Sequence, residues 1–256
     1  MKVVILAGGF GSRISEKTHS IPKPMIEIGG KPIIVHIMER YMRYGYTDFL
    51  IALGYKGQII KQYFANYHLM SSDFEVDLSN GIIKTNTNKG TNCKVTLVDT
   101  GLETMTGGRL NRLRNYLLNE RFFLTYGDGL SNINISNLLE HHIKSSKLLT
   151  MSIVRPPARF GVLEINNENI LTKFEEKPQL SSGWINGGFF VVEPNFLDYC
   201  KSDYEMLERE PINRALKNSE ISAFKHFGFW KCMDTLRDKN ELEKIFCNGD
   251  VPWIKD

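Results

Sequence analysis

Cysteine is scarce in this chain, and it is not arranged for a disulfide framework or a zinc site. The four cysteines, Cys93, Cys200, Cys232 and Cys247, are scattered through 256 residues. No two of them form a Cys-x-x-Cys pair, and none lies at zinc-ligand spacing from a histidine. The pattern predicts reduced thiols, which is typical of cytosolic proteins.

Long hydrophobic runs and a strong charge imbalance are also lacking. No stretch is long and apolar enough to predict a membrane span. The N-terminal run 1–9 is short and ends in glycines, which indicates a buried strand rather than a signal peptide. A net charge of +3 without clustered Lys and Arg gives no support to nucleic-acid binding. We expect a cytoplasmic protein with no nucleic-acid partner and no membrane partner.

Several catalytic signatures are missing as well. The sequence has no His-Glu-x-x-His pair and no Gly-x-Ser-x-Gly elbow, so a zinc protease and a serine hydrolase are unsupported. Its N-terminal glycine loop lacks the Gly-Lys-Ser/Thr ending of a P-loop. Ile14 stands where a dinucleotide fingerprint has its third glycine, and no convincing ribose-binding acid follows the second strand. These absences argue against a Rossmann dehydrogenase.

Apolar patterning alternates between strand and helix in the first half of the chain. We expect strands at 2–7, 49–53, 95–98 and 122–126, and helices at 32–44, at 57–67 and around Leu110, Leu113 and Leu117. This alternation predicts an α/β fold with a mixed, mainly parallel sheet and helices on both faces.

The second half of the chain is richer in strands. Segments 160–165 and 170–176 flank a turn-prone stretch and predict a hairpin, followed by strands at 185–192 and 221–227 and a helix at 234–246. No linker or repeat interrupts the chain, so we expect one domain, 1–256, with a β-rich extension. The polar stretch 71–92 fits either an excursion hairpin or an oligomer contact.

A glycine loop follows the first strand. In Leu6-Ala7-Gly8-Gly9-Phe10-Gly11-Ser12-Arg13 the glycines let backbone N–H groups approach a phosphate, and Arg13 would complement its charge. The alternative is a tight strand-to-helix turn. Downstream, Pro22-Lys23-Pro24 places a lysine in an extended, stiff segment, so it loses less entropy on meeting a phosphate. The alternative for Lys23 is a solvated loop position.

Two aspartates are candidates for holding a divalent cation. Asp128 lies in Tyr126-Gly127-Asp128-Gly129, directly after a predicted strand, where open α/β sheets bind ligands. Asp234 precedes the last predicted helix. Carboxylates suit Mg2+, which takes one or two of them together with phosphate oxygens. The alternatives are an Asp-Gly turn for Asp128 and a helix N-cap for Asp234.

Three further motifs offer polar groups for substrates. Glu176 and Lys177 end a strand before Pro178, and could bind sugar hydroxyls and a phosphate, respectively. Asn186 and Gly187 could bind sugar hydroxyls or form a bulge. The loop Thr106-Gly107-Gly108-Arg109 could contact a base or a ribose, or simply begin a helix.

Five of these motifs, in this order, resemble the signature of the sugar-1-phosphate nucleotidyltransferases. The glycine loop, Pro22-Lys23-Pro24, Gly127-Asp128-Gly129, Glu176-Lys177-Pro178 and Asn186-Gly187-Gly188 carry the resemblance, which extends from Met1 to about Trp253. Ser12 stands where the family more often has threonine, and it keeps the hydroxyl. The family implies a GT-A-like fold, Mg2+ as cofactor and often a homo-oligomer such as a hexamer.

Further segments resemble the family members that use CTP and glucose 1-phosphate. They are 54–57, 63–67, 98–101, 105–110 and 233–238. Uridylyl and thymidylyl relatives usually carry a Gly-Leu-Ala-Gln-Ala-like stretch where this chain has 106–110. The resemblance thus implies CTP, CDP-glucose for surface polysaccharides such as O-antigen, and pyrophosphate as the second product. A transferase for UTP, dTTP or another phosphorylated acceptor, or a non-catalytic nucleotide-binding module, remains the alternative.

The resemblance also assigns the site residues. Arg13, Lys23, Asp128 and Lys177 are expected to be catalytic, and Asp128 and Asp234 to hold the metal. The nucleotide would contact Leu6, Ala7, Gly8, Gly9, Gly11, Ser12, Arg13, Lys23, Thr106, Gly107, Gly108, Arg109 and Asp128. The sugar would contact Tyr126, Glu176, Lys177, Asn186 and Gly187.

Overall fold

The computed structural model describes most of the chain. It covers residues 1–11, 14, 20–85, 91–118, 120–155, 162–166, 168, 170–175 and 183–255.

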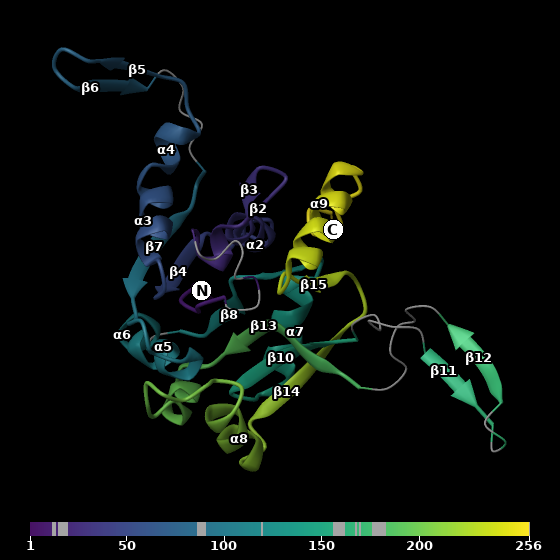
Figure 1. Ribbon diagram of the computed structural model, residues 1–256. Coiled ribbons are helices and arrows are strands. Elements are labelled where there is room, and N and C mark those ends of the chain that lie inside the picture. Colours follow the sequence, from purple (N-terminus) through teal and green to yellow (C-terminus); the bar gives the residue numbers. More distant parts are fainter. Residues whose placement is uncertain are drawn as a thin grey trace.

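A seven-stranded mixed sheet forms the centre of the molecule (Figure 1). In chain order its strands are β1 (Val3–Leu6), β4 (Asp48–Leu53), β7 (Lys94–Asp99), β8 (Phe122–Tyr126), β10 (Leu149–Val154), β13 (Ile185–Val192) and β14 (Ile221–His226). In space the order is β14-β10-β13-β8-β1-β4-β7, and within this sheet only β13 runs antiparallel to its neighbours. The expected mixed, mainly parallel sheet is confirmed.

Helices cover both faces of this sheet. One face carries α2 (Ile33–Met42), α3 (Gly57–Ala65), α7 (Ile135–Ser145) and α9 (Leu236–Cys247). The other carries α5 (Thr106–Arg112), α6 (Arg114–Leu117), η3 (Pro194–Tyr199) and α8 (Glu210–Lys217). Successive side chains of a strand point to opposite faces, so Val3 and Ile5 of β1 join the first core and Val4 and Leu6 the second.

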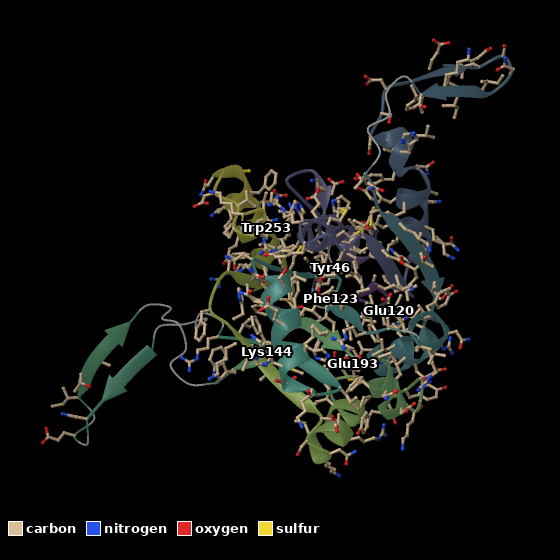
Figure 2. All side chains as sticks on the ribbon, turned by 180° about the vertical axis from the view of Figure 1, so that it is seen from behind. Tyr46, Glu120, Phe123, Lys144, Glu193 and Trp253 are labelled. Atoms are coloured by element: carbon tan, nitrogen blue, oxygen red, sulfur yellow. The ribbon has the colours of Figure 1, made fainter. Side chains whose placement is uncertain are left out.

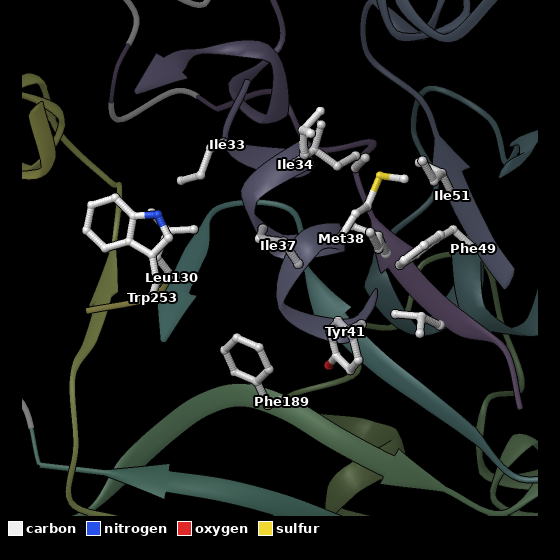
Figure 3. Close-up of a cluster of buried hydrophobic side chains, with 14 of the residues drawn as sticks. Ile33, Ile34, Ile37, Met38, Tyr41, Phe49, Ile51, Leu130, Phe189 and Trp253 are labelled. Atoms are coloured by element: carbon white, nitrogen blue, oxygen red, sulfur yellow. The ribbon is translucent and has the colours of Figure 1, made fainter. Parts of the chain in front are cut away.

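Helix α2 supplies much of the first core (Figure 3). Its apolar side chains recur at helical spacing, and Ile33, Ile37 and Tyr41 are all buried. The Tyr41 ring stacks on Phe189 of β13 with ring centroids 6.1 Å apart. Full burial of each such side chain stabilises the fold by about 1.5–3 kcal/mol. The helix expected at 32–44 begins at Ile33, with Pro32 as its N-cap.

Smaller elements connect the sheet to its surroundings. They are η2 (Lys23–Met25), β2 (Glu27–Ile28), β3 (Lys31–Pro32), α4 (Tyr67–Met70), β9 (Gly129–Ser131) and β15 (Trp230–Cys232). Among the helices in the described ranges, none is long and apolar enough to cross a lipid bilayer.

Two hairpins extend away from the sheet (Figures 1 and 2). One pairs β5 (Phe74–Asp77) with β6 (Ile82–Thr85), so the hairpin alternative for 71–92 is confirmed. The other pairs β11 (Val162–Ile165) with β12 (Leu171–Glu175) in antiparallel register, which confirms the hairpin expected at 160–176.

A buried histidine ties α2 to the C-terminal segment. His36 is 1% exposed, and the Trp253 indole donates to its Nδ1 over 3.2 Å. Since indole can only donate, Nδ1 is the acceptor and Nε2 carries the proton, which it donates to the Ile28 carbonyl at 2.9 Å. Burial lowers the pKa of His36 below its ordinary value, because the charged form would be desolvated.

This histidine should make the protein less stable in mild acid. Its folded pKa lies below the unfolded value of about 6.5, so the unfolded state binds more protons as pH falls below that value. The stabilising contribution is complete above pH 6.5 and declines by at most about 1.4 kcal/mol per pH unit below it. Urea unfolding at pH 7.5 and 5.5 should show a smaller pH-dependent loss in His36→Gln than in the parent. His142, which is also buried, remains in both proteins, so equal losses would mean that His36 does not contribute.

Candidate active site

The glycine loop leaves the sheet at the C-terminal end of β1. Ala7 continues the ladder by donating to the Ala52 carbonyl at 3.0 Å. Gly9 is exposed, and a Cβ added there would meet nothing within 4 Å. Gly11 has φ +65, a conformation that favours glycine. Ser12 and Arg13 lie outside the described residues. The space beside Gly9, at the C-terminal end of β1, is therefore open to an approaching phosphate, as a phosphate-binding loop requires.

The buried side chain of Arg109 holds this loop in place through hydrogen bonds. Its guanidinium donates to the carbonyls of Gly8 at 2.9 Å and Leu53 at 3.0 Å, and to Thr100 Oγ1 at 2.7 Å. A Cβ on Gly8 or on Gly54 would lie 2.4 Å from a guanidinium atom. Both glycines are therefore required by the close approach of one buried arginine, whose pKa is lowered by desolvation.

The expected contact of Arg109 with base or ribose stays a prediction. In the structure the residue is 3% exposed, and its guanidinium also donates to the carbonyls of Gly101 at 2.7 Å and Leu102 at 3.2 Å. The neighbouring backbone is also engaged, because Gly107 donates its N–H to the Glu205 carbonyl at 3.0 Å. A Cβ on Gly108 would lie 2.5 Å from Asp203 Cα. The glycine pair thus packs against 203–205, where the Gly107 N–H is engaged.

Replacing Arg109 should destabilise the protein and disable the loop. Arg109→Met leaves the carbonyls of Gly101 and Leu102 without this donor inside the protein. We expect a loss of about 2–4 kcal/mol in the free energy of unfolding, measured by urea denaturation. Arg112→Met is the matched control, because the Arg112–Asp203 pair is largely exposed and should cost under about 1 kcal/mol. Equal losses for the two variants would refute the supporting role of Arg109.

Asp128 and Asp234 are brought together by a short antiparallel ladder. Strand β9 pairs with β15 so that Gly129 lies opposite Cys232. The ladder continues as Met233 N donates to the Asp128 carbonyl at 2.9 Å. Since Asp128 directly precedes β9 and Asp234 shortly follows β15, residues 106 positions apart in sequence reach the same end of β8.

Lys23 lies between these carboxylates. Its ammonium donates to Asp128 Oδ2 at 2.6 Å and to Asp234 Oδ1 at 2.6 Å. Burial alone would lower the pKa of Lys23, but the Asp128 charge and the hydrogen bonds to both aspartates raise it above its ordinary value. The lysine is the first residue of the turn η2, not part of an extended segment as expected, and Pro24 fits beside Gly127.

Asp234 is not the N-cap of the last helix. That position belongs to Thr235, which forms a capping box with Asp238. The Asp238 carboxylate accepts from Thr235 N at 2.9 Å, and Asp238 N donates to Thr235 Oγ1 at 3.2 Å. Asp234 is thereby left to face Lys23 and Asp128, and of the two sequence alternatives the cap is wrong.

These carboxylates fit a hard divalent cation. One carboxylate oxygen of Asp128 and one of Asp234 already contact a positive charge, the ammonium of Lys23. Ligand atoms of Asp128, Asp234 and Cys232 lie within 4.8 Å of one another. Oxygen donors suit Mg2+ or a similar ion, whereas the Cys232 thiol has its pKa raised by burial and by the Asp128 charge and stays protonated. Sequence spacing gave no sign of Cys232, because Asp128 comes from a segment 104 residues earlier in the chain.

Three of the expected sugar-side residues, Tyr126, Asn186 and Gly187, lie near one another at the end of β8 that leads to Asp128. Asn186 Nδ2 donates to Tyr126 Oη at 3.2 Å, and the Trp230 indole donates to the Gly187 carbonyl at 2.7 Å. Burial, and then the Glu208 charge, raise the pKa of Tyr126 well above its ordinary value. Glu176 and Lys177 lie outside the described residues.

Comparison with known proteins identifies the family. Residues 2–230 match the model of the family described as Nucleotidyl transferase. Glucose-1-phosphate cytidylyltransferase of Salmonella typhimurium is 45% identical over 99% of this chain and 98% of its own. A Bacillus subtilis protein named as a probable glucose-1-phosphate cytidylyltransferase is 40% identical over 99% of each chain. The structure of HddC from Yersinia pseudotuberculosis, 23% identical, matches 96% of this chain and 99% of its own with a TM-score of 0.68, which supports the expected GT-A-like fold. The chain belongs to the nucleotidyl transferase family.

Proposed function

We propose that this chain is a glucose-1-phosphate cytidylyltransferase, which transfers a cytidylyl group from CTP to α-D-glucose 1-phosphate. The single observation that carries the proposal is the convergence of Lys23, Asp128 and Asp234 beside the glycine loop. They meet at the C-terminal ends of the central strands β1 and β8, in a chain of the nucleotidyl transferase family. The names of the similar Salmonella and Bacillus proteins support the choice of CTP and glucose 1-phosphate.

The chemistry asks mainly for positioning and charge neutralisation. A phosphate oxygen of the sugar phosphate attacks the α-phosphorus of CTP in line, forming one P–O bond, and the bond to pyrophosphate breaks. The products are CDP-glucose and pyrophosphate. Because the nucleophile is already an anion, no strong general base is needed. The site must instead hold several negative phosphates at close range.

The N-terminal half of the site supplies positive charge and backbone donors. We assign the triphosphate to the glycine loop of Gly8, Gly9 and Gly11, with Ser12 and Arg13 completing it. Lys23 would offset charge at the reacting phosphates, and its burial between two carboxylates holds it in place. Arg109 stabilises the loop by donating a hydrogen bond to the Gly8 carbonyl.

A divalent ion, Mg2+ in our proposal, fits the carboxylate pair. Asp128 and Asp234 would hold it, and when bound it would offset the charge of the phosphate oxygens. The two side chains come from different loops, so the β9–β15 ladder sets their separation.

The sugar side of the site is assigned to five residues. Lys177 would anchor the phosphate of the acceptor, and Glu176, Asn186 and Gly187 would sense its hydroxyls, with Tyr126 beneath them. The Asn186 amide supports this role because it lies next to Tyr126 at the end of β8 that leads to Asp128.

We also propose that the protein is a homo-oligomer in the cytoplasm. The β5–β6 hairpin supports association, because Leu78 is 91% exposed and Phe74, Ile82 and Ile83 are also exposed. A two-stranded hairpin is at best marginally stable by itself in water, so a covering partner would stabilise it. Analytical ultracentrifugation gives the number of subunits, for which we expect six, and a monomer would contradict the proposal.

A substrate matrix tests the proposed function. The purified enzyme is incubated with each of CTP, UTP, dTTP and GTP against glucose, galactose and mannose 1-phosphates, and pyrophosphate is measured. We expect the largest kcat/KM for CTP with glucose 1-phosphate. A higher value for UTP or dTTP would make the protein a different nucleotidyltransferase. Binding of CTP without pyrophosphate release from any pair would indicate a non-catalytic nucleotide-binding module.

A further inference from the structure

A chain of hydrogen bonds joins the start of α5 to the sugar side of the site. Leu207 N donates to Thr106 Oγ1 at 2.8 Å, and this hydroxyl donates to Glu208 Oε2 at 2.8 Å. From the other direction, Asn186 Nδ2 donates to Tyr126 Oη at 3.2 Å, and Tyr126 donates to Glu208 Oε1. Glu208 had no visible signal in the sequence, because it lies just before α8, far from every motif.

The donor and acceptor roles in this series of hydrogen bonds are set by Glu208, the acceptor that two of them share. Thr106 Oγ1 and Tyr126 Oη both donate to the carboxylate oxygens of Glu208, so both hydroxyl protons point at it. The Tyr126 oxygen is then available only as an acceptor toward Asn186, which requires the N–H side of the amide to face it. The amide oxygen consequently faces Gly188, whose N–H it accepts at 2.9 Å. Gly188 has φ +78 and packs on the Tyr126 ring, so this arrangement is sterically tight.

We infer that Glu208 is a positioning residue for sugar recognition, acting through Tyr126 on the orientation of the Asn186 amide. The inference rests on the proposed function. Tyr126 and Gly188 each use one site of the amide, and within the described part of the chain its other N–H and its other lone pair remain for a ligand. Their directions decide which pattern of sugar hydroxyls the amide can bind. A reversed amide would exchange donor and acceptor.

Removing the carboxylate should therefore impair sugar use more than CTP use. In Glu208→Leu, the Tyr126 proton loses its acceptor and can turn toward the Asn186 N–H, so the amide loses the acceptor on that side and is held only by the Gly188 N–H on its oxygen. Thr106 also loses its acceptor, but the start of α5 stays held by Met105 N on the Asp203 carbonyl at 2.7 Å. It is also held by the Leu207 bond to Thr106. The nucleotide side should change little.

The test is a double-mutant cycle of Glu208→Leu and Tyr126→Phe, with steady-state kinetics in CTP and glucose 1-phosphate. Each single variant should lower kcat/KM for glucose 1-phosphate about 10- to 100-fold and change KM for CTP less than about threefold. Because both act through one hydroxyl, the double variant should lose no more than about threefold beyond either single variant. Preference for glucose over galactose 1-phosphate should fall in all three.

Two controls separate the possible outcomes. Glu210→Gln, two residues along at an exposed position, should behave as the parent, and the thermal midpoints of all variants identify any that fail to fold. If Glu208→Leu does not fold, the isosteric Glu208→Gln takes its place in the cycle. The inference is overturned if the parent is active and Tyr126→Phe leaves kcat/KM for glucose 1-phosphate unchanged. It is also overturned if the variant lowers kcat/KM equally for CTP and for glucose 1-phosphate. An inactive parent overturns the proposed function instead.

Discussion

Asp128→Asn is expected to lower kcat by about two to four orders of magnitude at saturating CTP and glucose 1-phosphate. The variant keeps the shape of the side chain, but it removes one of the two negative charges that bracket the cation position at the sheet edge. Without that charge, a divalent ion would be held less firmly and the phosphates would repel one another more strongly. Pyrophosphate release in a coupled assay measures the effect.

The loss at Asp128 should be specific to its position. Asp198→Asn makes the same chemical change in another carboxylate paired with a cation, since Asp198 accepts from Arg114 at 2.9 Å. That pair is on the surface, and its loss should leave kcat unchanged and stability within about 1 kcal/mol. Normal turnover in Asp128→Asn would refute the cation-binding role of this carboxylate.

Lys23→Met should be the second severe variant, with kcat lowered by about two to three orders of magnitude. The methionine has a similar length and no charge, so the phosphates lose a fixed cation. In addition, Asp128 and Asp234 lose the ammonium that separates them at 2.6 Å from each. The variant should therefore depend more on a divalent ion for its stability than the parent does.

A thermal-shift measurement can detect that dependence without any turnover. Addition of Mg2+ should raise the unfolding temperature of Lys23→Met by more than that of the parent, because the ion replaces the missing counter-charge. Lys31→Met is the control, since Lys31 pairs with Glu39 at a partly exposed position, and it should follow the parent. Equal shifts in Lys23→Met and the parent would show that Lys23 and the ion do not share this position.

Much of the fold could be predicted from local patterns in the sequence. Strands β8 and β13 match the expected bounds, because residues 122–124 and 189–192 are apolar runs that are buried on both faces of the sheet. Helix ends were less predictable. The last helix begins two residues later than expected, because Thr235 and Asp238 form a capping box and release Asp234.

The site could be predicted only where one motif carried the chemistry. Asp128 and Asp234 were each ambiguous in sequence, and the β9–β15 ladder that joins them is a long-range pairing that no local pattern encodes. The same limit explains Arg109 and Glu208. Arg109 stood beside two glycines and suggested a ligand, yet its partners are carbonyls from other loops. The partners of Glu208 likewise come from distant segments.

In our proposal Asp128 and Asp234 hold one divalent ion against the phosphates of the nucleotide. A crystal structure with CTP and Mn2+, without sugar phosphate, tests it through the anomalous signal of manganese. We expect one manganese peak bonded to a carboxylate oxygen of each aspartate and to CTP phosphate oxygens, at about 2.1 Å as for Mg2+ ligands. A peak bonded to neither aspartate, with the CTP phosphates bound away from the glycine loop, would contradict it.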